Sequence, residues 1–244
     1  MARPRKPRVD ATLSLTTPGS SRRELWEDVA RTLREAILAG GIRAGASLVE
    51  ADLADRFDVS RGPIRDALRE LAREGLVVSL PRRGTVVSTL SFADIQEVYD
   101  VREGLEIAAA RLAIERASDA QLAELRTSVR ALEAAWDRDE DYADSLALDL
   151  AIHRQIVGLA SNGRLQAVYE QMLIQTQLNA VTAAELNPSL RRGMKRAAHR
   201  DILRALRARD PDGASHAISD HYAYARERLL SGYPAPEDDA IRRS

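Results

Sequence analysis

The stretch LVEADLADRFDVSRGPIRDALRELAREGLVVSLPRRGTVVS, residues 48–88, decides the fold of the first part of the chain. Its segment EADLADRF predicts a short helix over 50–57, and the pattern that follows predicts a second helix over 60–74. Two valine-rich runs, LVVSL (76–80) and TVVST (85–89), predict short strands joined by a tight connection. This order of elements is that of a helix-turn-helix followed by a β-hairpin wing.

The helix predicted over 60–74 has an apolar face and a cationic face. The apolar stripe consists of Ile64, Ala67, Leu68, Leu71 and Ala72. The opposite face carries arginines at successive i+4 steps, Arg61, Arg65, Arg69 and Arg73. In an isolated helix such a face is often only solvated surface. Here the basic hairpin tip Arg82-Arg83-Gly84 and a basic N-terminal arm favour DNA, with the start of the helix in the major groove.

The first helix and the charge distribution complete this domain. Leu25, Val29, Leu33, Ile37 and Leu38 recur at helical spacing before a glycine pair. We predict a disordered basic arm over 1–20 and a winged helix-turn-helix DNA-binding domain over 21–90. Residues 1–90 hold 16 basic and 12 acidic side chains, whereas residues 91–244 hold 20 and 25, so the front part is the one that attracts a polyanion.

After residue 91 the strand pattern stops and helical periodicity takes over. Short breakers separate periodic segments at 92–116, 119–137, 141–160, 163–184, 189–209 and 213–230. The fold class is therefore mainly α, with a six-to-seven-helix antiparallel bundle over 91–231 and a flexible tail over 232–244.

Composition excludes several classes of protein. The 244 residues are 45% apolar, enough for real cores, but no apolar run approaches the length of a membrane span, and the N-terminus has no signal-like apolar region. We therefore expect a cytoplasmic protein. The chain has no cysteine, which rules out disulfides and thiolate ligands, so a metal would have to be held by histidines and carboxylates.

The segment SLALDLAIHRQI (145–156) places Asp149 and His153 on an apolar helix face. A buried carboxylate is costly unless it is paired, so this face needs a partner. His199 and His221 lie mid-way along the predicted fifth and sixth bundle helices and can reach the same level of the core. Spacing alone leaves two interpretations: a divalent metal site, or an Asp–His hydrogen bond with the other histidines elsewhere.

Residues 48–88 resemble the winged helix of the GntR-type bacterial repressors over their whole length, with few departures. The resemblance implies that Ser60, Arg61, Arg65 and the wing glycine Gly84 contact operator DNA. We expect Arg82 and Arg83 at the hairpin tip to contact DNA as well. Position 62 is a glycine here, at a site that helps to choose bases in this family, so the operator sequence stays open.

Residues 92–230 resemble the all-helical effector domain of the FadR-like branch of these repressors. Its metal-binding subset has the motifs D-x-x-x-H and H-x-x-I/L-x-x-A followed by a last histidine, which DLAIH, HRDILRA and His221 match. The resemblance implies that Asp149, His153, His199 and His221 hold a divalent metal ion. Zinc is the first candidate, and nickel, manganese and iron are alternatives.

In the resembling domains the effector is a small organic acid or sugar acid. Arg102 matches an arginine common in this domain and could clamp a carboxylate, or instead form a salt bridge with Glu106 one turn later. Gln175 and Asn179 could line the effector pocket, or could be ordinary solvated polar residues.

These observations together predict a transcriptional regulator and not an enzyme. We expect a homodimer that binds an inverted-repeat operator, a repressor by the commoner arrangement in the resembling family, with a metal-assisted carboxylate pocket in the bundle. Two alternatives remain: a metal-dependent enzyme that acts on a small carboxylate, since such a site could activate water, and a metal-free bundle used only for dimerisation.

Overall fold

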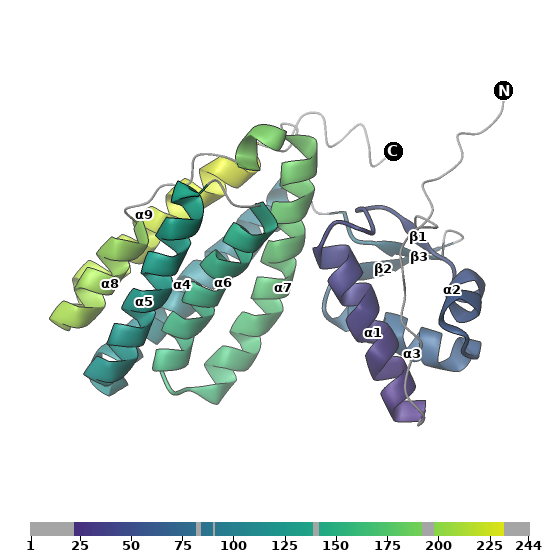
Figure 1. Ribbon diagram of the computed structural model, residues 1–244, viewed down its shortest axis with the longest axis horizontal. Helices are drawn as coiled ribbons and strands as arrows, with labels where there is room; N and C mark the ends of the chain where they lie inside the picture. The colour runs from purple at the N-terminus through teal and green to yellow at the C-terminus, as the bar shows by residue number, and fades with distance from the viewer. Residues whose placement is uncertain (1–21, 82–83, 90, 139–141, 192–197, 232–244) are drawn as a thin grey trace. The chain divides into compact units, whose positions relative to one another are not determined.

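The computed structural model describes residues 22–81, 84–89, 91–138, 142–191 and 198–231 (Figure 1). These residues form two compact units that divide at residue 90. The predicted arm and tail lie outside the described residues.

The N-terminal unit has three helices and a small antiparallel sheet. The helices are α1 (Arg22–Leu38), α2 (Glu50–Phe57) and α3 (Arg61–Arg73). The strands are β1 (Ser47–Leu48), β2 (Val77–Leu80) and β3 (Gly84–Val87), in the order β1-β3-β2. The β2–β3 hairpin pairs Val77 with Val87 and Leu80 with Gly84, which makes it the expected wing.

Two details of this unit differ from the prediction. The sequence did not indicate β1, which is only two residues long and pairs Ser47 with Val86, too short for a period-two pattern. Ala72, predicted to lie in the apolar stripe of α3, is exposed at its edge. The rest of the stripe is buried, and α1 packs against α3 with Arg34 donating two hydrogen bonds to the Glu74 carboxylate.

The C-terminal unit is an all-helical bundle. Its α-helices are α4 (Phe92–Arg116), α5 (Asp119–Asp137), α6 (Tyr142–Leu159), α7 (Gly163–Leu186), α8 (Ala198–Ala208) and α9 (Pro211–Leu230). Several begin at side-chain caps, as sequence patterns suggest: Ser91 and Ser118 each form a capping box, and Asn162 and Asp210 accept from the first turns of their helices. The predicted mainly helical fold, a winged helix-turn-helix followed by a helical bundle, is confirmed.

The helix predicted over 189–209 is not continuous. A 3-10 helix, η1 (Pro188–Arg191), follows α7, and α8 begins only at Ala198. The side chain of Asn187 accepts hydrogen bonds from the backbone N–H and the hydroxyl of Ser189, at 3.1 and 2.6 Å. This local turn competes with helical hydrogen bonding at the end of α7, where Asn187 is the C-cap residue.

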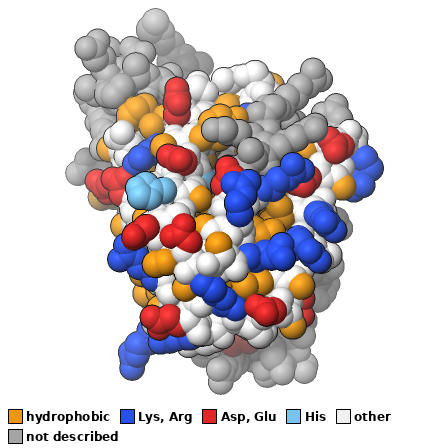
Figure 2. Space-filling model, turned by 90° about the vertical axis from the view of Figure 1, so that its left-hand side faces the viewer, with side chains coloured by type: hydrophobic (Ala, Val, Ile, Leu, Met, Phe, Trp, Pro, Cys, Tyr) orange, Lys and Arg blue, Asp and Glu red, His pale blue; other side chains and the backbone are white. Residues whose placement is uncertain are grey.

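Among the described residues, no helix combines the length and apolar character that a membrane crossing needs. Basic and acidic side chains are interspersed over the face of the molecule drawn in Figure 2. Such mixed charge is what solvated helix faces carry, so the chemistry of the bundle has to be sought in its interior.

Candidate functional sites

The first site is the exposed face of α3. Burial of Ile64, Leu68 and Leu71 on one side of the helix turns Arg61 and Arg65 to solvent. Ser60 precedes the helix in an extended conformation, is exposed, and makes no side-chain capping hydrogen bond, so its hydroxyl remains available to a phosphate. These three predicted DNA contacts therefore lie together at the start of one helix.

Arg65 is held in place by an acidic side chain of the preceding helix. Its guanidinium lies 3.2 and 3.5 Å from the two carboxylate oxygens of Glu50, and this pairing raises the pKa of Arg65. Both side chains are exposed, so the pair contributes little stability. The pair holds the Arg65 guanidinium in a position from which it can exchange Glu50 for a DNA phosphate or a guanine edge.

The wing is described only at its base. Gly84 has a φ of +73°, a left-handed conformation that favours glycine, and no atom lies within 4 Å of where a Cβ would be. Glycine is therefore needed there for backbone conformation and not for space. Arg82 and Arg83 lie outside the described residues, and their predicted contacts with DNA stay a prediction.

The second site is the interior of the bundle, where the predicted metal ligands converge. Asp149 and His153 lie one turn apart on α6, while α8 contributes His199 and α9 contributes His221. All four are at least nine-tenths buried. The candidate ligand atoms of the three histidines lie within 4.8 Å of one another. His216, the remaining histidine, is exposed and bonds to the Asp212 carbonyl, so it takes no part.

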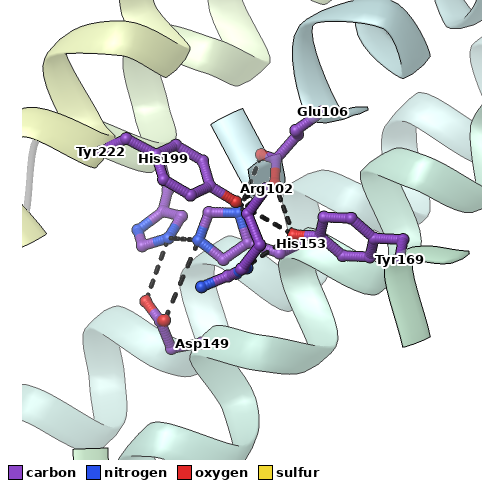
Figure 3. A network of polar contacts seen from close by, with 7 residues as sticks. All are labelled: Arg102, Glu106, Asp149, His153, Tyr169, His199 and Tyr222. Atoms are coloured by element: carbon purple, nitrogen blue, oxygen red, sulfur yellow. Dashed lines mark hydrogen bonds and ion pairs between the residues drawn. The ribbon is translucent and has the colours of Figure 1, made fainter. Parts of the chain in front are cut away.

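The spacing of these atoms is suited to a cation. His199 Nε2 lies 3.1 Å from an Asp149 oxygen and 3.4 Å from His153 Nε2, which is itself 3.9 Å from Asp149 (Figure 3). Neighbouring ligands of one zinc ion, with bonds of about 2.1 Å, are separated by roughly 3.0–3.4 Å. The side chains present therefore fit a divalent ion with little rearrangement.

The protonation states of the ligands support the same conclusion. Burial, followed by the charges of His153 and His199, holds the pKa of His221 well below its usual value, so its imidazole is neutral and keeps a lone pair. Burial would raise the pKa of Asp149, but its hydrogen bond to His199 and the charge there lower it. Within the described chain, Nδ1 of His199 and Nδ1 of His221 have no hydrogen-bond partner.

Glu106 on α4 lies behind this site and forms hydrogen bonds with three other side chains, and its carboxylate is completely buried. It lies 2.8 and 2.9 Å from His153 Nδ1 and accepts hydrogen bonds from the hydroxyls of Tyr169, at 2.7 Å, and Tyr222, at 2.8 Å (Figure 3). Burial alone would raise the pKa of Glu106, but the charge and hydrogen bond of His153 and the bond from Tyr169 lower it to about 2.

An ionised carboxylate can only accept hydrogen bonds, so His153 donates to Glu106 from Nδ1. The neutral tautomer that makes this bond has its lone pair on Nε2, the nitrogen that lies near Asp149 and His199. A carboxylate that orients a histidine ligand from behind is a common feature of metal sites. Glu106 therefore prepares His153 as a ligand.

Arg102 lies on the same buried face of α4, one turn before Glu106. Its guanidinium donates to the Tyr169 hydroxyl at 3.1 Å and stacks on three tyrosine rings, those of Tyr99, Tyr169 and Tyr222, at 5.1–5.6 Å from the ring centres. It reaches Glu106 through Tyr169, so the direct salt bridge considered from the sequence is not formed. Its Nε has no partner among the described residues.

Arg102 and the metal ligands open into one cavity of about 720 Å³, counting the space at its mouth. Its wall includes Thr176 and Ala180 of α7. Gln175 and Asn179, predicted to line this pocket, are not among the residues that do, and Asn179 is fully buried. One residue along a helix is a rotation of about 100°, so Gln175 and Asn179 point away from their neighbours Thr176 and Ala180. Their contact with an effector stays a prediction.

The sequence did not indicate that Glu106 and the tyrosines belong to this buried network. From the sequence, Glu106 is expected only as a possible salt-bridge partner of Arg102, although both residues fall on the apolar stripe that contains Ile95 and Ala113. That is the same signal that singled out Asp149. The tyrosines gave no signal, because a tyrosine at a core position is ordinary.

Comparison with known proteins agrees with both halves of this structure. The family model of the FCD domain matches residues 97–224, and that of the bacterial regulatory proteins of the gntR family matches residues 25–87. The chain belongs to the GntR family of bacterial regulators and carries an FCD domain. Members of this family bind operator DNA, which agrees with the exposed arginines of α3.

The matches to individual relatives cover most of both chains. The chain is 31% identical to the probable D-xylose utilization operon transcriptional repressor of Paenarthrobacter nicotinovorans, over 84% of this chain and 90% of that protein. It is 28% identical to the HTH-type transcriptional repressor RspR of Escherichia coli, over 80% and 84%. The structure of E. coli McbR/YncC has the same fold, with a TM-score of 0.71 at 22% identity, over 86% and 99%. The first two relatives are named as transcriptional repressors and not as enzymes.

Proposed function

We propose that this GntR-family regulator is a repressor whose affinity for its operator is set by a small carboxylic or sugar acid bound at a metal site in the bundle. The observation that carries the proposal is the cluster of His153, His199 and His221, whose candidate ligand atoms lie within 4.8 Å of one another. Asp149 lies 3.1 Å from His199 Nε2, and Arg102 lines the same cavity. Two relatives are named as repressors, which supports the sign of regulation.

In this proposal the three imidazoles and Asp149 hold a divalent ion, with zinc as the first candidate. The ion would supply a positive charge with open positions for a ligand oxygen. Glu106 keeps His153 in the tautomer whose Nε2 can bind the ion. Arg102 offers a second positive charge to the carboxylate of the bound acid. The site thus binds the acid reversibly and without a chemical reaction, as a sensor requires.

Control of DNA binding requires two states of a dimer that differ in the spacing of their α3 helices. An inverted-repeat operator matches such a dimer, one half-site for each winged helix. A ligand shifts this equilibrium only through unequal affinity for the two states. The cavity contains side chains of α4, α6, α7, α8 and α9, so an acid bound there contacts most helices of the bundle at once.

Metal content tests this proposal directly. Full-length protein, stripped with a chelator and then dialysed against zinc, should bind about one ion per chain by elemental analysis. The His199→Ala variant should retain much less, while His216→Ala, a change to an exposed histidine, should load like the parent. A parent protein that retains no zinc, nickel, manganese or iron would favour the metal-free dimerisation bundle and overturn the proposal.

A further inference from the structure

The cavity beside the metal ligands is polar at its inner end and mainly apolar along its wall. The inner end holds Arg102, Asp149 and the three histidines. Aliphatic side chains from four elements form much of the wall: Leu146, Leu150, Ala180, Leu190, Ala225 and Leu229. A bound molecule would therefore have a polar environment at one end and a mainly apolar environment along the rest of its length.

Helix geometry gives the length of this passage. Tyr142 and Asp149 both line the cavity and are seven residues apart on α6, and His221 and Arg228 are seven apart on α9. Seven residues of α-helix rise about 10 Å. Because Tyr142 lies at the start of α6 and Arg228 near the end of α9, these two residues mark the outer end of the cavity.

The wall between these ends is not wholly apolar. Its polar residues include Trp136, whose Nε1–H has no hydrogen-bond partner in the described chain, and four tyrosines: Tyr99, Tyr142, Tyr222 and Tyr224. Thr176 is a polar side chain in the wall, and its hydroxyl donates to the Met172 carbonyl at 2.8 Å. At the outer end, Arg228 donates a short hydrogen bond to the Leu190 carbonyl. Hydroxyl groups of a ligand placed along the aliphatic wall would lose water without gaining partners, which is unfavourable.

We infer that the effector is a carboxylate with an apolar body, such as a branched-chain or arylalkanoic acid, and not a polyhydroxylated sugar acid. The inference deepens the proposed function and rests on it. The carboxylate meets the metal and Arg102, which has a guanidinium N–H without a partner in the described chain. Figure 3 shows the Arg102 side chain running past the His153 ring toward the side on which Asp149 lies.

The carbon body then occupies the aliphatic passage toward Tyr142. Trp136 adds an aromatic wall beside the metal ligands, with its ring centre 6.1 Å from that of His199. A flat or branched apolar group gains from contact with these side chains, because its own surface leaves water and carries no polar group that needs a partner.

Matched acids test the inference on zinc-loaded full-length protein. 4-Methylpentanoate and phenylacetate are compared with gluconate and xylonate at equal concentration and ionic strength, by thermal stabilisation and by calorimetric titration. The apolar acids should raise the melting temperature by several degrees and bind at least tenfold more tightly than the sugar acids. Zinc content is measured in the same samples.

Variants in the wall separate binding in the cavity from binding elsewhere. Ala225→Leu and Ala180→Leu fill the passage and should each abolish the response to phenylacetate while zinc content stays unchanged. Ala223→Leu, at an exposed position of the same helix as Ala225, should respond like the parent. Two variants are used so that a folding defect in one does not decide the result.

The outcomes distinguish this inference from the proposed function. Zinc-loaded protein that responds to gluconate or xylonate and not to the apolar acids would overturn the ligand class but leave the metal-dependent sensor intact. Zinc-loaded protein that responds to neither group would also overturn the inference. Protein that binds no metal would remove the proposed function itself.

Discussion

The DNA-binding face of α3 and the interior of the bundle differ in how far their charged side chains are exposed to solvent. On α3 the arginines are exposed and pair locally, as Arg69 does with Asp66 and Arg73 with Glu70, each three residues apart. In the bundle, Glu106 is 0% exposed, Arg102 3% and His153 1%, and their side-chain hydrogen bonds go to side chains of other helices.

This difference determines what each site can tolerate. An exposed charge keeps its water, so its partner can be exchanged for a DNA phosphate at little cost. A buried charge depends on a complete set of partners, and the loss of one leaves the others unpaired. The DNA-binding face should therefore respond to mutation through binding, and the bundle interior through stability and ligand affinity together.

The largest effect should come from Glu106→Ala. It leaves the hydroxyls of Tyr169 and Tyr222 and the His153 Nδ1–H without their acceptor, and removes a negative charge that stabilises the Arg102 cation. The free energy of unfolding should fall by about 3–5 kcal/mol, measured by denaturant titration of metal-free protein. Glu97→Ala, at an exposed position of the same helix, should change it by less than about 0.5 kcal/mol. Equal effects would show that the buried network contributes no more than surface charge.

Metal removal should have the next largest effect. Free zinc at 100 times its dissociation constant should stabilise the parent by about 2.7 kcal/mol relative to chelator-treated protein, because folded protein binds the ion and unfolded protein does not. His199→Ala should lose most of this stabilisation, and His216→Ala should keep it. The measurement is the melting temperature with and without chelator. A chelator that leaves the parent's melting temperature unchanged would contradict the metal site.

On α3, Arg61→Ala and Arg65→Ala should each weaken binding to an operator fragment by about 1–3 kcal/mol and relax its base preference. The free energy of unfolding should change by less than about 0.5 kcal/mol, since both side chains are exposed. Arg73→Ala, three turns further along the helix, is the control. If it weakened binding more than Arg61→Ala does, the start of α3 would not be the part that enters the groove. The measurement is fluorescence anisotropy with labelled DNA selected from a random pool.

The smallest effect should come from Glu50→Gln. It removes the exposed ion pair with Arg65 and a negative charge near the DNA-binding face. Stability should change by less than about 1 kcal/mol, and operator affinity should increase a few-fold because Arg65 no longer has to exchange partners. Weaker DNA binding in this variant would show instead that Glu50 is needed to hold Arg65 in its binding position.

The same contrast explains what the sequence could predict. The amphipathic pattern of α3 and the caps of the bundle helices are local, so they were visible in the sequence, and the predicted helical fold is confirmed. The three histidines came together because each lies at a core position of its own helix. Local patterns did not reveal which polar groups meet behind them. The bonds of Glu106 join residues 47 to 116 positions apart, and only the packing of the helices sets those distances.

The effector-binding role of Gln175 and Asn179 stays a prediction for a related reason. Much of the circumference of α7 is buried, including Leu178 and Asn179 as well as Thr176 and Ala180, so burial alone does not say which side faces the cavity. Periodicity gives the phase of a helix only when one face is clearly polar.

The most direct test of the central claim is operator affinity of zinc-loaded protein with and without a saturating acid that raises its melting temperature. The account predicts that the acid changes the affinity of the parent about tenfold or more, and that it has no effect on His199→Ala, which should still bind DNA. The same change in both proteins, or none in the parent despite bound acid, would contradict the claim that the metal site in the bundle controls DNA binding.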